Sequence, residues 1–489
     1  MSLVLPRIAR RTVLAGGAAL LAAPLIGCGG NAAPRAASAG GRLRETQAGG
    51  KPITLTAQER PLLLGTNSGP TPTWLYGDDL LPVLRVKRGE SLDVTLENKL
   101  TEHSSIHWHG VRVPNAMDGV PYVTQKPVQP GESFTYRFTP PDPGTFFFHP
   151  HCNTAVQLGR GLSGILIVEE DRVGAYDDDI VLALKDWRVA PDGSFLPFVT
   201  VEGAGRAGTF GTLRTVNGAV APEIAAPAGA TIRLRILNLD ATRVGDIGIQ
   251  GADAALIAVD GNPLPHVPLD TWRLGPAMRI DVAVLMPAKG EKVALVDFFA
   301  AEPVTLATLV ASDEVQKNGA YEFQESVPLA ELDLTVAQLR QLRLSASATP
   351  SDYSGLAPIV LPDGSTIDLL DSLCSTARTM WAIDGKPWPQ NGHEHLPPPI
   401  MDLKRGESVQ IEFVNTTPHV HPMHLHGHTF KVLSSSKLQR PLHWADTVLV
   451  MPEERVQIAF VADNPGNWMI HCHLIEHQDT GMMAWFRVA

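Results

Sequence analysis

Residues 404–415 read KRGESVQIEFVN, and the pattern recurs as VKRGESLDVTLEN at 86–98 and as AGATIRLRILN at 228–238. In each segment a glycine lies nine residues before an asparagine, and apolar residues alternate with polar ones between the two. Residues two apart on a strand project from the same face, so this alternation predicts a strand with one buried face. Three matches at a single spacing predict three similar β domains in succession.

The rest of the chain fits an all-β fold class. The 43 glycines and 40 prolines favour many turns between short strands over long helices. Further strands are predicted at 132–138, 164–170, 179–187, 279–286 and 446–451.

The repeats also predict the domain organisation. We predict domains over 51–172, 173–315 and 371–489, with residues 316–370 as the link between the second and the third. Within that link, residues 327–345 carry a weak helical period and are interpreted as a surface element.

Composition excludes one broad class of partner. The chain has 489 residues, a formal net charge of −11 and 44% hydrophobic residues, which is typical of a globular protein of several domains. It carries 40 Lys+Arg against 51 Asp+Glu, with no extended basic run. We therefore expect no nucleic-acid partner.

The first fifty residues resemble an export segment. The pair Arg10-Arg11 precedes an apolar stretch from about Val13 to Ile26, and this stretch is too short for a membrane span. The arginine pair and the apolar stretch together resemble a twin-arginine signal. Leu25 to Cys28 resembles a lipobox, whose cysteine would be lipidated and would attach the protein to a membrane. The alternative is cleavage after Ala39 and release. Both predict a periplasmic protein, or one outside the inner membrane, and residues 1–50 are expected to lie outside the fold.

Four short motifs hold ten of the 17 histidines, and each motif contains an H-x-H pair. Such a pair on a strand directs two imidazoles to the same side. Eight nitrogens are too many for one ion, so a cluster of two or three metal ions is predicted, without the metal being identified. The four pairs are His107 and His109, His149 and His151, His424 and His426, and His471 and His473. The histidines without this spacing are expected on the surface or behind the ligands: His103, His393, His395, His419, His428 and His443.

Cys472 indicates which metal is bound. It lies between His471 and His473, so it must point to the opposite face of the strand, where His477 and Met482 can meet it. His421 would complete a set of two His, one Cys thiolate and a weak Met, which are the ligands of a blue-copper electron-transfer site.

The other cysteines are not expected to hold the fold together. Cys28 lies in the export segment, which leaves only Cys152 and Cys374 free to pair. We interpret Cys152 as a packing residue or as the partner of Cys374.

At this point the motifs HWHG at 107–110, HPHC at 149–152, HPMHLHGH at 421–428 and HCHLIEHQDTGMM at 471–483 resemble a known family. They are similar to multicopper oxidases of the laccase-like, three-domain bacterial type. The resemblance implies three cupredoxin-like Greek-key β-sandwich or barrel domains and four copper ions. It also implies that a reducing substrate is oxidised in single-electron steps and that dioxygen is reduced to water.

The resemblance further assigns each ligand. The type 1 ligands would be His421, Cys472, His477 and Met482. The type 2 ligands would be His107 and His424. The ligands of the type 3 pair would be His109, His149, His151, His426, His471 and His473.

Acidic residues near the cluster deliver protons in this family. Asp118 matches one such aspartate, with a turn residue as the alternative interpretation. The other acid of many bacterial relatives follows the second type 1 histidine, where this chain has Gln478, which can orient water but cannot titrate. Glu476 and Asp479 are adjacent, and Glu476 is kept as a candidate.

The reducing substrate is the least defined feature. Cuprous oxidases of the family carry a methionine-rich insertion, but this chain has 11 methionines, of which only Met380 lies between 300 and 400. Phenols or aromatic amines are therefore expected, with Cu(I), Mn(II) or Fe(II) as the alternative. A non-catalytic scaffold and a pure electron carrier are less well supported, because every ligand position is filled. A monomer is expected.

Overall fold

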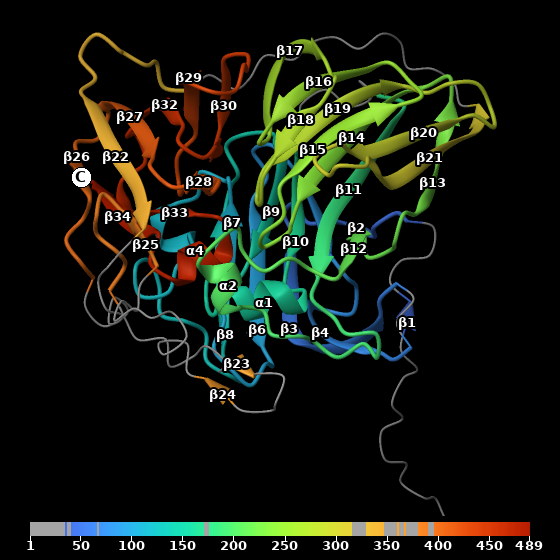
Figure 1. The fold of residues 1–489 in the computed structure, drawn as a ribbon, viewed down its shortest axis with the longest axis horizontal. Coiled ribbons are helices and arrows are strands. Elements are labelled where there is room, and N and C mark those ends of the chain that lie inside the picture. The colour runs from blue at the N-terminus through green and yellow to red at the C-terminus, as the bar shows by residue number, and fades with distance from the viewer. Residues whose placement is uncertain are drawn as a thin grey trace, which may run out of the picture. The chain divides into compact units, whose positions relative to one another are not determined.

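The computed structural model describes residues 35–36, 41–65, 68–170, 176–314, 329–346, 359–360, 366–367, 380–389 and 396–489. In this part of the chain, six sheets of five or six strands form three β-sandwiches in succession, which confirms the all-β prediction (Figure 1). The predicted export signal with Cys28, the cysteine Cys374 and the histidines His393 and His395 lie outside the described residues. No described helix has the length and apolar character needed to cross a bilayer.

The first sandwich consists of two mixed sheets. One has the order β1 (Arg35–Ala36), β3 (Pro52–Leu63), β6 (Leu92–Asn98) and β8 (Ser133–Phe138), with β4 (Thr71–Tyr76) paired to β3. The other has the order β2 (Glu45–Gln47), β5 (Val83–Lys87), β10 (Gly164–Glu169), β9 (Gly144–His149) and β7 (His107–His109).

The second sandwich repeats this plan. One sheet has the order β12 (Leu213–Val216), β11 (Asp178–Trp187), β14 (Thr231–Asn238), β19 (Arg279–Leu285), β16 (Ala254–Val259) and β17 (Asn262–Pro268). The other has the order β13 (Glu223–Ala228), β21 (Val304–Glu314), β20 (Lys292–Asp297), β15 (Gly245–Gln250) and β18 (Trp272–Leu274).

The third sandwich follows it again. One sheet has the order β25 (Trp381–Ile383), β22 (Leu339–Ala346), β27 (Ser408–Asn415), β32 (Arg455–Val461), β29 (Phe430–Ser435) and β30 (His443–Ala445). The other has the order β26 (Met401–Leu403), β34 (Met483–Val488), β33 (Gly466–Cys472), β28 (His421–Leu425) and β31 (Thr447–Val450).

A few short elements lie outside these sheets. They are the pair β23 (Ile359–Val360) and β24 (Thr366–Ile367), the 3-10 turn η1 (Asn115–Met117), and the helices α1 (Thr154–Arg160), α2 (Val201–Ala204) and α4 (Ile475–Asp479). Both α1 and α2 contact α4 (Figure 1).

The repeated segment forms the same strand in each domain. Strands β6, β14 and β27 each pair in parallel with the strand on one side and antiparallel with the strand on the other. The glycine before each strand has a positive φ, of 83° at Gly89, 65° at Gly229 and 85° at Gly406, which a side chain would strain.

The asparagine at the end of each repeated strand is buried and holds the following turn. In Asn98, Asn238 and Asn415, the side-chain oxygen accepts from the backbone N–H two residues later. The side-chain nitrogen donates to carbonyls of the loops beyond. The Gly-to-Asn spacing in the sequence therefore indicates both turns that flank the strand, because the glycine forms the turn before it and the asparagine holds the turn after it.

Two predicted boundaries need correction. Residues 339–346 were expected in the link, within a helical element, but they form β22, which pairs in parallel with β27 and belongs to the third sandwich. Leu342 and Leu344 alternate into the core, as a strand requires. At the other end, β1 and β2 pair with strands of the first sandwich, so the fold begins before residue 51.

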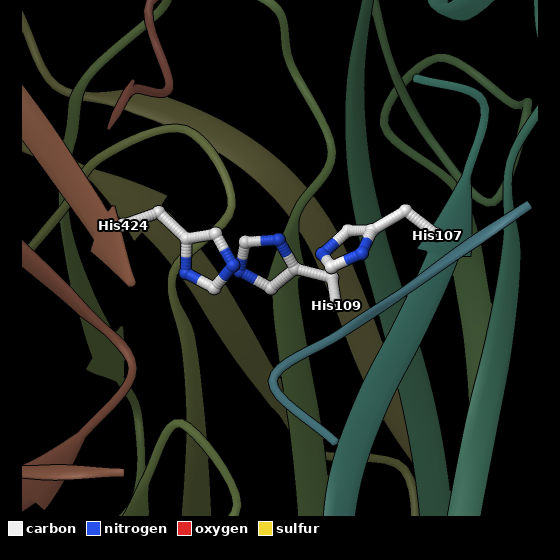
Figure 2. A group of neighbouring side chains, drawn as sticks. All are labelled: His107, His109 and His424. Carbon is white, nitrogen blue, oxygen red and sulfur yellow. The ribbon is translucent and has the colours of Figure 1, made fainter. Parts of the chain in front are cut away.

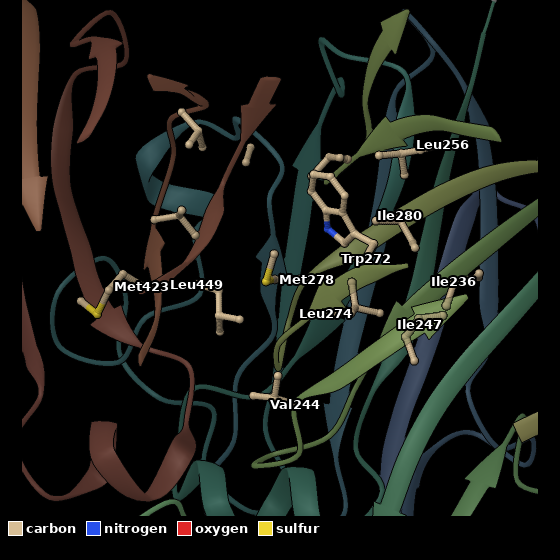
Figure 3. Close-up of a cluster of buried hydrophobic side chains, with 14 of the residues drawn as sticks. Ile236, Val244, Ile247, Leu256, Trp272, Leu274, Met278, Ile280, Met423 and Leu449 are labelled. Atoms are coloured by element: carbon tan, nitrogen blue, oxygen red, sulfur yellow. The ribbon is translucent and has the colours of Figure 1, made fainter. Parts of the chain in front are cut away.

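The second and third domains share one continuous apolar core. Figure 3 shows Trp272, Leu274 and Met278 of the second domain facing Leu449 and Met423 of the third. A Cβ on Gly275 would lie 2.7 Å from Leu449 and 3.4 Å from both Met278 and Pro422. At Gly275, side chains of the third domain therefore pack directly against the backbone of the second domain.

His443 was expected on the surface or behind a ligand. The structure places it at this domain interface instead. It is 4% exposed, its Nδ1–H donates to the Pro441 carbonyl at 2.8 Å, and its ring meets Trp272 at 5.5 Å. Burial lowers the pKa of His443 to about 4. The folded protein therefore keeps this imidazole neutral at pH values where the unfolded chain protonates it.

The His443→Gln variant is expected to make the fold less sensitive to acid. A lowered folded pKa means that stability is lost as pH falls below the unfolded value of about 6.5, by about 2 kcal/mol between pH 7 and pH 5 for this one group. Denaturant unfolding at both pH values measures the difference. His266→Gln is the control, because that side chain is exposed. Equal acid sensitivity in the His443→Gln variant and the unaltered protein would contradict the assignment.

Candidate metal centre

The eight histidines of the H-x-H pairs meet where the first and third domains face each other. Strand β7 pairs with β9, which sets His107 opposite His149. Strand β28 pairs with β33, which sets His424 opposite His471. The second member of each pair lies at or just beyond the strand end, and all eight are at most 9% exposed.

These side chains form three groups, each with ligand nitrogens within 4.8 Å of one another. The groups are His107, His109 and His424; His109, His149 and His473; and His151, His426 and His471. Figure 2 shows the first of them, with strands of two domains directing their imidazoles to one point. Between two of the other rings, His426 Nε2 and His471 Nε2 are 3.1 Å apart.

The hydrogen bonds of these rings leave the inward nitrogens available for a metal. Nδ1 of His107, His149 and His471 each faces a backbone carbonyl, at 2.9, 3.0 and 3.0 Å. A carbonyl only accepts, so Nδ1 carries the proton and Nε2 keeps its lone pair. Six of the eight rings have a buried nitrogen without a hydrogen-bond partner: His107, His109, His149, His151, His424 and His473. A cluster of cations fits this donor set.

Electrostatics also favours neutral ligands. Burial lowers the pKa of His109, His149 and His151, and neighbouring imidazoles lower it further. Neutral imidazole is the form that binds a metal.

A fourth group lies on the other face of β33. Cys472 Sγ is 3.7 Å from His421 Nδ1 and 3.8 Å from His477 Nδ1, and these two nitrogens are 3.1 Å apart. Each Nε2 is engaged elsewhere, with Thr417 Oγ1 at 2.8 Å for His421 and with the Arg206 carbonyl at 2.6 Å for His477. Both Nδ1 atoms therefore converge on the sulfur.

Met482 lies next to this group, as predicted. It is fully buried, its N–H donates to the His477 carbonyl at 2.8 Å, and its carbonyl accepts from the Cys472 N–H at 3.0 Å. Burial raises the pKa of the Cys472 thiol, which a bound cation would counteract. The structure thus brings the eleven predicted His and Cys ligands together in two neighbouring sites, and it places the backbone of Met482 beside the second.

A buried ion pair supports the cluster from the second domain. Arg279 is fully buried and donates to Asp446 twice, at 2.9 Å and 2.6 Å. Asp446 Oδ1 in turn accepts from His109 Nε2 at 3.1 Å, and its carbonyl accepts from His424 Nδ1 at 2.8 Å. Burial alone would raise the pKa of Asp446, but the Arg279 guanidinium and His424 outweigh it, so that pKa lies below its ordinary value.

Gly110 and Asp260 both contribute to the Arg279–Asp446 ion pair. A Cβ on Gly110, whose φ is 82°, would lie 2.3 Å from Asp446 Oδ2 and 2.6 Å from Arg279 Nη2, so the glycine of HWHG lets the ion pair approach the backbone. Asp260 accepts from the Arg279 N–H at 2.9 Å and from the Thr447 N–H at 3.0 Å. A domain without any predicted ligand therefore orients two histidines of the cluster.

Asp118 lies where the sequence predicted an acid near the cluster. It is 1% exposed; its Oδ2 accepts from His426 Nδ1 at 2.9 Å, and its Oδ1 lies 3.2 Å from His107 Nδ1. Its carboxylate thus orients one histidine from each domain, and its role in proton transfer stays a prediction.

The residues around position 478 form α4 and not a strand. Gln478 is buried, and its Nε2 donates to Thr154 Oγ1 at 3.4 Å and to Asp479 Oδ1 at 3.2 Å. The Glu476 carboxylate binds the loop that contains α2 instead, where it accepts from Thr200 N at 3.1 Å and from both N and Oγ1 of Thr209. Its described hydrogen bonds therefore serve this loop, and proton delivery by Glu476 stays untested.

Cys152 is a buried free thiol in this structure. Its Sγ lies 3.7 Å from Ser105 Oγ, and burial raises its pKa to about 12. Its burial fits the packing interpretation, while a pairing with Cys374 falls outside the described residues. Behind the ligands, His428 donates from Nδ1 to the His426 carbonyl at 3.2 Å, as expected.

Comparison with known proteins gives one consistent result. Models described as multicopper oxidase match residues 65–173, 181–313 and 370–489. The multicopper oxidase MmcO of Mycobacterium tuberculosis is 30% identical, over 88% of this chain and 86% of its own. The multi-copper oxidase structure from Pseudomonas thermotolerans is 37% identical with a TM-score of 0.79, over 91% and 100% of the two chains. A metallo-oxidase of Campylobacter jejuni is 25% identical with a TM-score of 0.74, over 93% and 95%. The chain belongs to the multicopper oxidase family, and its buried histidine groups are copper sites.

Proposed function

We propose that this oxidase holds four copper ions, takes single electrons from a small aromatic reductant and reduces dioxygen to two waters. The observation that carries the proposal is that three buried donor groups consist of histidines alone and a further one combines two histidines with Cys472. His421, Cys472, His477 and Met482 would hold one ion, and the eight histidines of the H-x-H pairs would hold three. When bound, copper supplies one-electron redox chemistry at the first site and the reduction of dioxygen at the second.

Cys472 connects the two sites through the backbone. Its sulfur lies with His421 and His477, while the flanking His471 and His473 belong to the histidine groups. An electron that reaches the Cys472 thiolate thus needs to cross only one peptide unit to reach His471 or His473, each of which belongs to a histidine group.

The small number of methionines in the chain favours an aromatic reductant over Cu(I). Soft Cu(I) prefers thioether and thiolate ligands. Of the 11 methionines, only Met380 lies between 300 and 400, and Met482 is already assigned. Oxidation of Cu(I), Mn(II) or Fe(II) is the alternative, because one relative is described as a metallo-oxidase.

Oxygen uptake by the copper-loaded protein tests the proposal. We expect an intense blue absorption from the thiolate and oxygen consumption with a methoxyphenol. Blue colour without uptake from any donor would indicate an electron carrier, and uptake with Cu(I) but not with the phenol would support the metal-ion alternative.

Gln478→Glu is expected to speed turnover. Glutamate can carry a proton where glutamine cannot, so oxygen uptake at saturating reductant should rise roughly two- to tenfold if proton delivery limits the rate. Gln478→Met is the matched control, because it removes the amide without adding an acid. Unchanged uptake in the Gln478→Glu variant would contradict a proton-limited rate.

We also propose that the twin-arginine-like segment that precedes β2 exports the protein, either with Cys28 lipidated or with cleavage after Ala39. The mass of the mature N-terminus separates these two outcomes, and an uncleaved cytoplasmic chain would contradict both.

A further inference from the structure

The imidazole of His477 is covered by a loop of the second domain. Its Nε2–H donates to the Arg206 carbonyl at 2.6 Å, and the residue is fully buried. Arg206 itself is exposed. A reductant therefore reaches the peptide of Arg206 before it could reach the ligand.

Side chains of the third domain hold this loop in place. Glu476, next to His477, binds Thr200 and Thr209 at either end of the loop. Trp381 donates from Nε1 to the Ala204 carbonyl at 2.6 Å, and its ring lies 4.2 Å from that of His477. The loop thus has a defined position over the ligand.

A cavity of about 1010 Å³ opens on the outer side of the same loop. Its lining residues are Arg188, Thr200, Val201, Glu202, Gly203, Gly205, Arg206, Ala207, Gly208, Thr209 and Phe210. None of these described lining residues is a methionine, histidine or cysteine, so the cavity lacks soft ligands for Cu(I).

The charges in the cavity favour an anion. Two guanidiniums, of Arg188 and Arg206, and one carboxylate, of Glu202, line the cavity, and Glu202 is paired with Arg206 at 2.7 Å. The Glu476 carboxylate lies behind the lining, where Thr200 and Thr209 donate hydrogen bonds to it. Arg188 uses Nε and Nη1 to bind the carbonyls of Pro197 and Phe210. Phe210 is 45% exposed and offers an aromatic surface for stacking.

We propose that this cavity binds aromatic reductants that carry a carboxylate, with the ring beside Phe210 and the carboxylate at the guanidiniums. The electron then leaves through the Arg206 peptide and its hydrogen bond to His477. This proposal rests on the proposed oxidase function. In the overall reaction four phenols each lose one electron and one proton, and these convert one dioxygen to two waters and leave four phenoxyl radicals.

The test compares syringate with its methyl ester, which differ in the carboxylate charge. Arg206→Gln keeps the backbone carbonyl but removes a cation and leaves Glu202 unpaired, so KM for syringate is expected to rise about tenfold, with KM for the ester changed less than about twofold. Glu202→Gln should lower KM for syringate. The control Arg487→Gln removes a charge from an exposed pair with Asp402 outside the cavity and should change neither value.

The outcomes separate the two proposals. Equal effects of Arg206→Gln on both donors, a KM for syringate that falls in Arg206→Gln, or one that rises in Glu202→Gln, would overturn the anion site while leaving the oxidase intact. No oxygen uptake from either donor by the copper-loaded, unaltered protein would overturn the oxidase proposal and the site with it.

Discussion

Replacing Cys472 with serine is expected to abolish the blue absorption and to lower oxygen uptake by roughly a thousandfold or more. A hydroxyl is nearly the same size as a thiol, so the buried position between His421 and His477 should still pack. It cannot supply the thiolate that binds copper and carries electrons to the flanking histidines. Visible absorption, copper content and oxygen uptake with a methoxyphenol measure the change.

Cys152→Ser is the matched control for this prediction. Cys152 is also buried beside a pair of cluster histidines, but its thiol contacts Ser105 and none of the histidine groups includes it. The control should therefore keep both the blue absorption and the activity. A Cys472→Ser variant that stays active, or a Cys152→Ser variant that loses its colour, would contradict the assignment of the two thiols.

The histidine groups could be predicted from the sequence because local geometry determines them. On a strand, H-x-H directs two rings to one side and Cys472 to the other, whatever the rest of the fold does. Strand pairing then only has to bring His107 next to His149 and His424 next to His471. The three Gly-to-Asn repeats were equally local, since one residue forms the turn before the strand and the other holds the turn after it.

The features that sequence reasoning missed depend on contacts between distant parts of the chain. Leucines at 339, 342 and 344 have mixed spacing, and pairing with β27 selects a strand over a helix. The loop over His477 reads as an ordinary glycine-rich turn, and only its bonds to Glu476 and Trp381 give it a role. Nothing near Asp446 in the sequence indicated that a residue of another domain would pair with it.

The second large effect is expected at Asp446, which joins Arg279 to the cluster. Asp446→Ala would remove the nearest acid from a fully buried guanidinium, whose remaining ion-pair partner is Asp260 at 3.4 Å. It would also leave His109 Nε2 with the Thr447 hydroxyl as its hydrogen-bond partner. Removing one partner of a buried ion pair costs about 3–5 kcal/mol of folding free energy. We expect a loss of this size in denaturant unfolding, together with fewer cluster coppers per chain.

Asp446→Asn separates the loss of charge from the loss of shape. Asparagine can still accept from His109 and keeps the side-chain volume, so cluster copper should be retained better than in the alanine variant, even though the ion pair is lost. Glu223→Ala is the surface control: its pair with Lys292 is exposed, and such a pair contributes about 0–1 kcal/mol. If Asp446→Ala unfolds like this control and binds its full copper, the second domain does not hold the cluster histidines. If instead stability falls and the blue absorption survives while copper at the histidine groups is lost, Arg279 acts through Asp446 on those histidines alone.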